Sequence, residues 1–170
     1  MRKIAALVIS VVCLLGSYIA SAEDQGGKDQ SELAKVVTSA KVSLEKGLAA
    51  SKASGKPISA KFEIEDGKAQ LSVYTEKGGS FSEVVVNHET GKVSKSEAIT
   101  GGEDLDAAKA QSAAMAKAKS SLAAALKKAL QKNEGSHAAS VTPSLKDGHP
   151  IADVMIVKGT EFRTVSEKLD

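Results

Sequence analysis

One stretch of the sequence occurs twice in similar form, and this repeat limits the possible folds more than any other feature. DGKAQLSVYTEKGGSF runs from Asp66 to Phe81, and DGHPIADVMIVKGTEF runs from Asp147 to Phe162. Each copy contains an Asp-Gly pair, a run of alternating apolar residues and a second glycine turn. Internal similarity at a fixed spacing indicates a duplicated structural unit. We therefore expect two copies of one supersecondary arrangement.

A helical pattern precedes each copy. Apolar residues recur there at every third or fourth position, so each set lies along one face of a helix. The first set is Leu33, Val37, Ala40, Leu44 and Leu48, and the second is Met115, Ala118, Leu122 and Leu126. The second set follows the last four residues of the first at one constant spacing. Each pattern predicts one helix.

After each helix the apolar period changes to two, which is typical of a strand with one buried face. The alternating residues are Ile58, Ala60, Phe62 and Ile64 in the first copy, and Ala139, Val141, Pro143 and Leu145 in the second. Pro143 indicates an edge strand or a bulge, because proline lacks an N–H donor. The Asp-Gly pairs at 66–67 and 147–148 predict tight hairpin turns.

The chain therefore has the pattern of an α+β protein with two tandem units. In each unit we expect one helix packed on a three-stranded antiparallel meander, because a meander alone leaves one apolar face uncovered. The expected ranges are 31–94 for the first unit, 95–106 for a polar linker and 107–170 for the second unit. Units of this size are marginally stable alone, so we expect them to pack together.

The first 22 residues read as a secretory signal peptide. A basic Arg2-Lys3 pair precedes an apolar run over 4–16, and Ala20-Ser21-Ala22 forms a cleavage site. The apolar run is too short to cross a bilayer as a helix, although an uncleaved N-terminal anchor is the alternative. We expect a bacterial protein of the periplasm or exterior, with a disordered leader over 23–30 and no membrane insertion after cleavage.

The mature chain is formally neutral. Cleavage removes Arg2 and Lys3 from the 23 basic residues and none of the 21 acidic ones, which leaves 21 of each. Whole-chain charge thus gives no reason to expect nucleic acid as a partner. The single cysteine, Cys13, leaves with the signal, so neither disulfides nor thiol chemistry are expected.

No residue pattern predicts catalysis, a cofactor or a metal site, and we expect no enzyme activity. His88, His137 and His149 lack the short spacings of metal ligands. Asp66 and Asp147 are better explained as the first residues of hairpin turns than as paired catalytic carboxylates.

One sheet face is a candidate contact surface for a partner. If Leu71, Val73 and Thr75 face the helix, the alternate residues of that strand and of its copy point the other way. These residues are Gln70, Ser72, Tyr74, Ile151, Asp153 and Met155. Aromatic and methionine side chains are enriched in protein interfaces. The alternative is that the two sheets stack and bury these side chains.

The first copy resembles the PepSY domain of exported bacterial proteins. The resemblance lies in AKFEIEDGKAQLSVYTEKGGSFSEVVVNHETGKV, with its Asp-Gly hairpin and its third strand running into Thr90-Gly91. Asn87 stands where the family usually has aspartate, and the second copy ends at Asp170, before a Thr-Gly turn is reached. Similar domains occur in propeptides of thermolysin-type metallopeptidases, which implies a role in restraining proteases.

Together these observations predict a non-catalytic exported module that binds another polypeptide. The expected partner is an envelope or secreted protease, which the module would inhibit or regulate, or another polypeptide. The alternative is a module that binds a small molecule or a metal ion in a pocket between the repeats.

Overall fold

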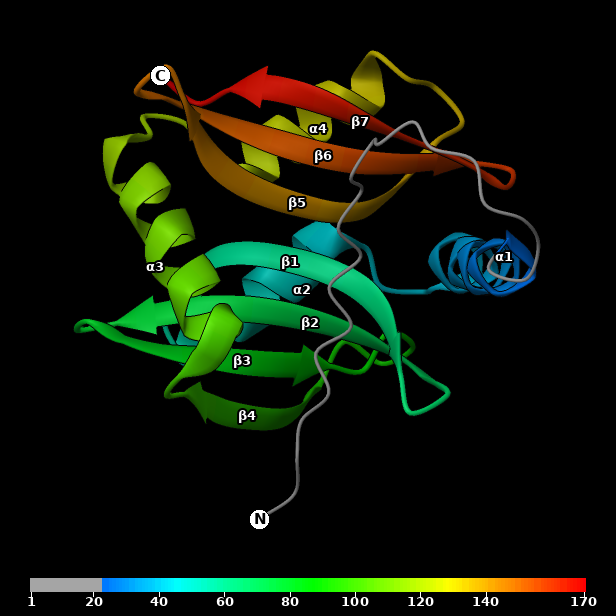
Figure 1. Ribbon diagram of the computed structural model, residues 1–170, viewed down its shortest axis with the longest axis horizontal. Coiled ribbons are helices and arrows are strands. Elements are labelled where there is room, and N and C mark those ends of the chain that lie inside the picture. The colour runs from blue at the N-terminus through cyan, green and yellow to red at the C-terminus, as the bar shows by residue number, and fades with distance from the viewer. Residues whose placement is uncertain (1–22) are drawn as a thin grey trace.

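The computed structural model describes residues 23–170 (Figure 1). The predicted signal peptide, 1–22, lies outside the described residues. The elements in chain order are α1 (Glu23–Ser39), α2 (Leu44–Ala50), the 3-10 turn η1 (Ser51–Ala53), β1 (Lys56–Glu65), β2 (Lys68–Lys77), β3 (Ser80–Val86), β4 (Val93–Ile99), α3 (Gly102–Lys117), α4 (Leu122–Gln131), β5 (His137–Lys146), β6 (His149–Lys158) and β7 (Glu161–Lys168). The α+β class is confirmed.

The prediction of two separate three-stranded units is wrong. All strands belong to one seven-stranded antiparallel sheet in the order β4-β3-β2-β1-β5-β6-β7. The segment expected as a linker, 95–106, contains most of β4 and the start of α3, and 23–30 lies in α1. The sheet is continuous because β1 of the first copy pairs with β5 of the second.

The junction between the copies lies on a pseudo-twofold axis. Ala60 of β1 pairs with Val141 of β5, and the offset between these two positions is the same one that relates Asp66 to Asp147. Each is therefore the repeat equivalent of the other. The two copies meet as the subunits of a symmetric dimer would, through the same strand of each copy.

Pairing across the junction is short. Only Ala60–Val141 and Lys61–Ser140 are in register. Pro143 follows on β5 and has no N–H to donate toward β1, so the ladder cannot continue past it. Equivalent bulges bend both strands: the one between Pro57 and Ser59 of β1 lies at the Pro143 end of the junction, and the one between Ala138 and Ser140 of β5 lies at the other end. The β1–β2 and β5–β6 hairpins consequently diverge from one another (Figure 1).

Each predicted helix is in fact two helices. The first breaks between Ser39 and Leu44 and the second between Lys117 and Leu122. At the first break, the backbone N–H groups of Lys41 and Val42 donate to the His88 carbonyl. At the second, those of Lys119 and Ser120 donate to the Leu169 carbonyl in the same way. Amides that a continuous helix would bond internally are therefore satisfied by carbonyls that lie just beyond the ends of β3 and β7.

A serine restarts the helix after each break. The Ser43 side chain accepts from the Lys46 N–H, and the Ser121 side chain accepts from the Ala124 N–H. Serine is a favoured N-cap because its hydroxyl satisfies an otherwise unpaired amide. The recurring Ser-Leu pair, 43–44 and 121–122, thus marks the start of α2 and α4.

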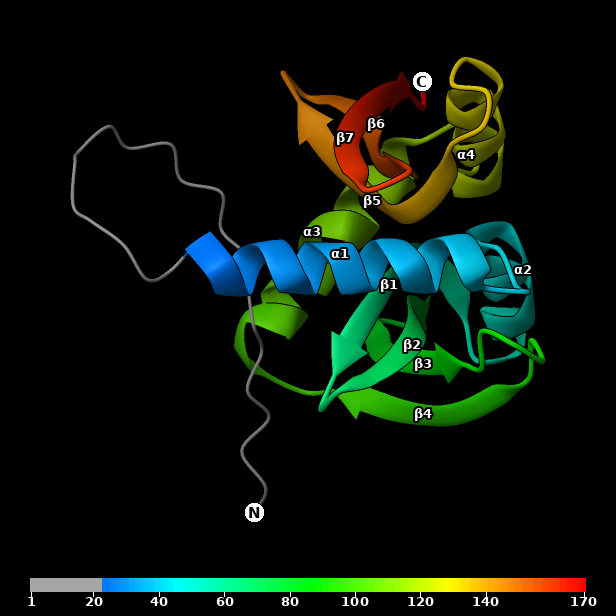
Figure 2. The same ribbon diagram turned by 90° about the vertical axis from the view of Figure 1, so that its right-hand side faces the viewer.

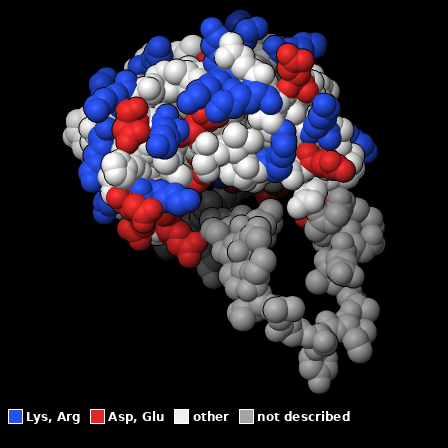
Figure 3. All heavy atoms as spheres, turned by 90° about the horizontal axis from the view of Figure 1, so that it is seen from above, with Lys and Arg blue, Asp and Glu red and all other residues white. Residues whose placement is uncertain are grey.

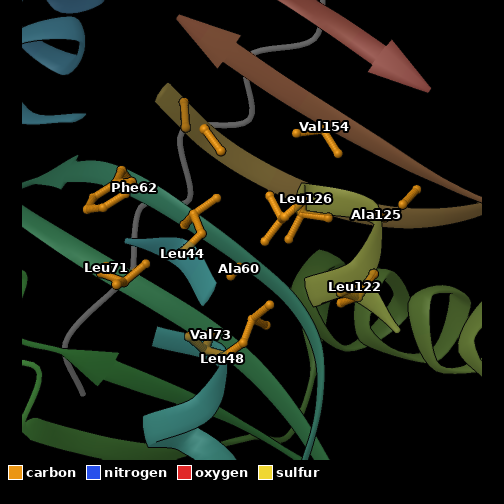
Figure 4. Packing of buried hydrophobic residues seen from close by; sticks show 14 of the residues in the cluster. Leu44, Leu48, Ala60, Phe62, Leu71, Val73, Leu122, Ala125, Leu126 and Val154 are labelled. Atoms are coloured by element: carbon orange, nitrogen blue, oxygen red, sulfur yellow. The ribbon is translucent and has the colours of Figure 1, made fainter. Parts of the chain in front are cut away.

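One apolar core serves both copies. Leu44 and Leu48 of α2, and Leu122 and Leu126 of α4, pack over Ala60 and its neighbours on a single face of the sheet (Figure 4). Buried residues of both halves form one continuous cluster. We call this the inner face of the sheet and the opposite one the outer face.

The two longer helices, α1 and α3, each pack against strands of both halves. α1 packs against β1 but also against β5 and β6, and α3 packs against β5 and β6 but also against β1 and β2. Figure 2 shows α1 running between the β1–β4 half and the β5–β7 half. Among residues 23–170, no helix has the length and apolar character needed to cross a membrane.

Candidate functional site

The structure divides the predicted contact surface into two groups. All six side chains alternate with inner-face residues and so lie on the outer face. Gln70, Ser72 and Tyr74 belong to β2, while Ile151, Asp153 and Met155 belong to β6. β1 and β5 lie between these strands, so the six residues do not form one patch.

In the group on β2, Ser72 and Tyr74 are buried and Tyr74 contacts α3, whereas Gln70 is half-buried. Tyr74 is 8% exposed, and its hydroxyl donates to Asp104 Oδ1 at 2.7 Å. The Ser59 hydroxyl donates to Gln111 Oε1, also at 2.7 Å. Burial, followed by the Asp104 carboxylate, raises the pKa of Tyr74 well above its usual range, so the phenol stays protonated. In this arrangement Tyr74 serves to hold α3 on the sheet.

Beside this contact a groove of about 170 Å³ runs under α3. Its lining includes Ser59, Lys61, Ser72, Tyr74, Asp104, Gln111 and, from the second half, Thr142. The Lys61 ammonium lies 5.9 Å from the centre of the Tyr74 ring and 2.6 Å from Glu63 Oε2. The groove thus crosses the junction between the copies and contains both hydrogen-bond donors and acceptors.

Carboxylates gather on the outer face next to the groove. The Gln70 amide nitrogen donates to Glu63 at 3.1 Å and to Glu65 at 2.8 Å, so Gln70 is held within the first half. Burial raises the pKa of Glu83, the Ser72 hydroxyl opposes that shift, and the Glu63 charge adds to it. This part of the outer face is acidic and internally paired.

The group on β6 remains accessible. Met155 is 37% exposed, and Ile151 and Asp153 are half-buried. The Ser166 hydroxyl donates to Asp153 Oδ1. In register, Met155 lies between Ser140 of β5 and Thr164 of β7, so small polar side chains flank it. This part of the outer face combines an exposed apolar side chain with small neighbours.

The inner side of β7 carries a buried ion cluster. Glu167 is 2% exposed, and its carboxylate contacts Lys132 at 2.7 Å and Lys128 at 3.0 Å, both near the end of α4. Burial acts to raise the pKa of Glu167, but the hydrogen bonds from Lys132 and Lys128 outweigh it and lower that pKa. The repeat equivalent of Glu167 in the first half is Val86.

The three histidines lie apart. His88 Nδ1 is buried without a hydrogen-bond partner, His137 is exposed, and His149 Nδ1 lies 2.9 Å from Asp170 Oδ2. Hydrogen bonding to His149 lowers the pKa of Asp170. Within the described part of the chain, no three His, Cys, Asp or Glu side chains group as metal ligands.

Two features escaped sequence reasoning: the α3 cover over Tyr74 and the sheet edges at β4 and β7. Both depend on which strands become neighbours, which the local pattern does not encode. Comparison with protein-family models, with curated proteins and with solved structures finds no match for this chain.

Proposed function

We propose that this protein is a non-catalytic exported module that binds another polypeptide through its second half. The contact surface is the outer face of β6 and β7, centred on Met155. The proposal rests on a difference in burial between two equivalent positions of the repeat. Tyr74 in the first half lies beneath α3, whereas Met155, its repeat equivalent in the second half, is exposed.

An exposed methionine suits a polypeptide partner because its flexible, polarizable side chain adapts to varied apolar contacts. Thr142, Thr164 and Ser166 beside it are small and uncharged, and the Asp153 carboxylate accepts a hydrogen bond from Ser166. Desolvating this patch therefore costs less than desolvating the first half's outer face, where Glu63, Glu65 and Glu83 lie together. The PepSY resemblance of the first copy adds a partner class to the proposal, an envelope or secreted protease. Occlusion by a rigid sheet would then restrain the protease.

The test is capture of a defined partner. The protein lacking residues 1–22 is immobilised and exposed to envelope extract, and retained polypeptides are identified by mass spectrometry and remeasured as purified pairs. Met155→Asp is expected to weaken binding of the identified partner at least tenfold, because it buries a charge at the contact centre. Val93→Asp, at an apolar position of β4 that is 43% exposed, is the matched control. Equal loss in both variants would contradict the assignment.

The groove under α3 favours a second candidate, a small polar ligand. Lys61, Asp104 and Gln111 supply a cation, a carboxylate and an amide around one space that spans both copies. Thermal-shift screening against metabolites and metal ions tests this candidate, with Lys61→Met as the variant expected to abolish the shift. A shift that persists in Lys61→Met would place the ligand elsewhere.

A further inference from the structure

The free edge of β7 has an internal counterpart that is occupied. β3 and β7 are repeat equivalents, and each is the third strand of its meander. The far edge of β3 pairs with β4 from Phe81–Ile99 to Val86–Val93. Among residues 23–170, no strand pairs with the corresponding edge of β7. The duplication therefore shows which kind of element this edge accepts, an antiparallel strand.

The backbone of β7 is set up for such pairing. Gly159-Thr160 is a two-residue hairpin loop, which makes Lys158–Glu161 a pair bonded to each other. Bonding alternates along an antiparallel ladder, so Arg163, Val165 and Glu167 use their backbone groups toward β6. Phe162, Thr164 and Ser166 consequently direct theirs to the open edge. No register shift interrupts the β6–β7 ladder.

Apolar side chains at this edge are less covered than their equivalents. Phe81 and Val84, flanked by β4, are 8% and 0% exposed. Their equivalents Phe162 and Val165 are only half-buried. A strand on β7 would cover both residues, as β4 does in the first half.

The other open edge, β4, is less suited to a partner. A register irregularity lies between its pairs with Val85 and Val86, and Lys95 and Glu97 form an exposed ion pair along it. Bulges and exposed charges, lysine above all, are the usual means of blocking edge-to-edge association. β7 has charged residues near its ends but Thr164-Val165-Ser166 at its centre.

The charge beside the β7 edge indicates which side chains a strand bound there would carry. Lys128, Lys132 and Arg163 lie on the inner side of β7, with Glu167 as the acidic group among them. Figure 3 views the molecule from the end that carries β7 and α4, and basic side chains are prominent over it. An incoming strand meets an excess of positive charge on that side.

We propose that the open edge of β7 binds an extended segment of a partner polypeptide as an antiparallel eighth strand. The segment carries an apolar side chain opposite Phe162 and an acidic one opposite Arg163. This inference rests on the proposed polypeptide-binding function and names the form that the partner takes. Strand addition draws its affinity from main-chain hydrogen bonds and its specificity from alternate side chains.

The probe is the sequence that occupies the equivalent edge. A fluorescein-labelled peptide KVSKSEAIT, copied from 92–100, places the counterpart of Ile99 opposite Phe162 and that of Ala98 opposite Arg163. Binding to the protein is followed by anisotropy. The peptide with Ala98→Glu is expected to bind about fivefold more tightly than the one with Ala98→Lys, the difference shrinking at high salt. Equal affinities for the two peptides would contradict the charge assignment.

A backbone variant tests the edge itself. Thr164→Pro removes an amide that faces the open side and leaves the β6 ladder intact, so it is expected to weaken peptide binding at least tenfold. Thr164→Ala retains the amide and is the control. Circular dichroism checks that both variants fold. Binding that survives Thr164→Pro unchanged would overturn the proposal.

A strand joined covalently to the protein tests docking at β7 even where the free peptide binds weakly. Asp170 is the repeat equivalent of Glu89, so appending TGKVSKSEAIT, copied from 90–100, after Asp170 reproduces the β3–β4 connection on β7. Tethering gives a local concentration on the order of millimolar. Hydrogen exchange at the Phe162, Thr164 and Ser166 amides is expected to slow at least tenfold. Unchanged exchange would contradict docking at this edge.

Polypeptide binding and strand addition at β7 are distinguished by separate outcomes. If a purified partner binds the protein and binds Thr164→Pro equally well, polypeptide binding stands and strand addition is wrong. If strand docking holds but the extract yields no partner, the edge is competent and the proposed function fails.

Discussion

At the residue scale, one carboxylate shows how the second half departs from the first. Glu167 occupies the position that Val86 fills in the other copy, and the end of α4 supplies Lys128 and Lys132 to neutralise it. A buried carboxylate is tolerated because each oxygen has a cationic partner. Both lysine side chains are more than half exposed, which limits the net stabilisation.

Glu167→Gln is expected to reduce the free energy of unfolding at pH 7 by about 1 to 2 kcal/mol, because charge-assisted hydrogen bonds are lost. The pKa of Glu167 is lowered in the folded state, so its stabilisation is present above the unfolded pKa and is lost as pH falls through the folded one. Urea titrations at pH 7 and pH 3 should therefore show the two proteins converging in acid. Glu161→Gln, at an exposed position, should show no such convergence.

A second residue-scale prediction concerns Gly47 in α2. A Cβ added there would lie 2.6 Å from Leu71 Cδ2, so Gly47→Ala forces the β2 side chain to move. Overpacking of this kind costs roughly 1–3 kcal/mol, partly offset by the better helix propensity of alanine. The double variant with Leu71→Val should recover part of the lost thermal stability. The repeat equivalent of Gly47 in α4 is Ala125, which is buried there without such a conflict.

At the element scale, the features that the sequence predicts correctly are those decided by interactions between residues close together in the chain. The Asp66 and Asp147 turns were predicted and have φ of 49° and 52°, because an Asp-Gly hairpin is decided within a few residues. The helix breaks were missed although Ser43 and Ser121 mark them locally. The apolar period continues across each break, and the carbonyls of His88 and Leu169 that satisfy the broken turns come from distant parts of the chain.

The caps give an element-scale prediction. Ser121→Ala removes the side chain that accepts from the Ala124 N–H and should lower the free energy of unfolding by about 1 kcal/mol. Because α4 is short, its amides should also exchange faster with solvent than those of the wild type. Ser120→Ala, one residue before the cap, is the matched control. Identical effects of the two substitutions would contradict the capping role.

At the scale of the whole molecule, the two copies form one domain and not a pair. Their strands share a sheet, their buried residues share a core, and α1 and α3 each contact strands of both halves. The repeat predicted the three-stranded meander of each half, but not the helix breaks or β4. It also did not predict that the two meanders join in one sheet, since edge pairing of β1 with β5 depends on contacts between distant segments. Of the six predicted surface residues, Ser72 and Tyr74 are buried, Gln70, Ile151 and Asp153 are half-buried, and Met155 is exposed.

Shared packing predicts cooperative unfolding. The chain should unfold in one transition by circular dichroism and calorimetry, with equal van't Hoff and calorimetric enthalpies. A fragment of residues 101–170 alone should give no cooperative transition, because it lacks the core contributed by the first half. A fragment that folds independently would show that the halves are separate domains.

An NMR experiment gives the sharpest test of the pseudo-twofold junction. In the β1–β5 ladder, Lys61 and Ser140 face one another. They form the closely spaced type of antiparallel pair, in which the Cα atoms lie about 4.5 Å apart. The structure predicts a strong NOE between the Hα protons of Lys61 and Ser140. Spectra that show the hairpin NOEs within each half but none between these two protons would contradict the single continuous sheet.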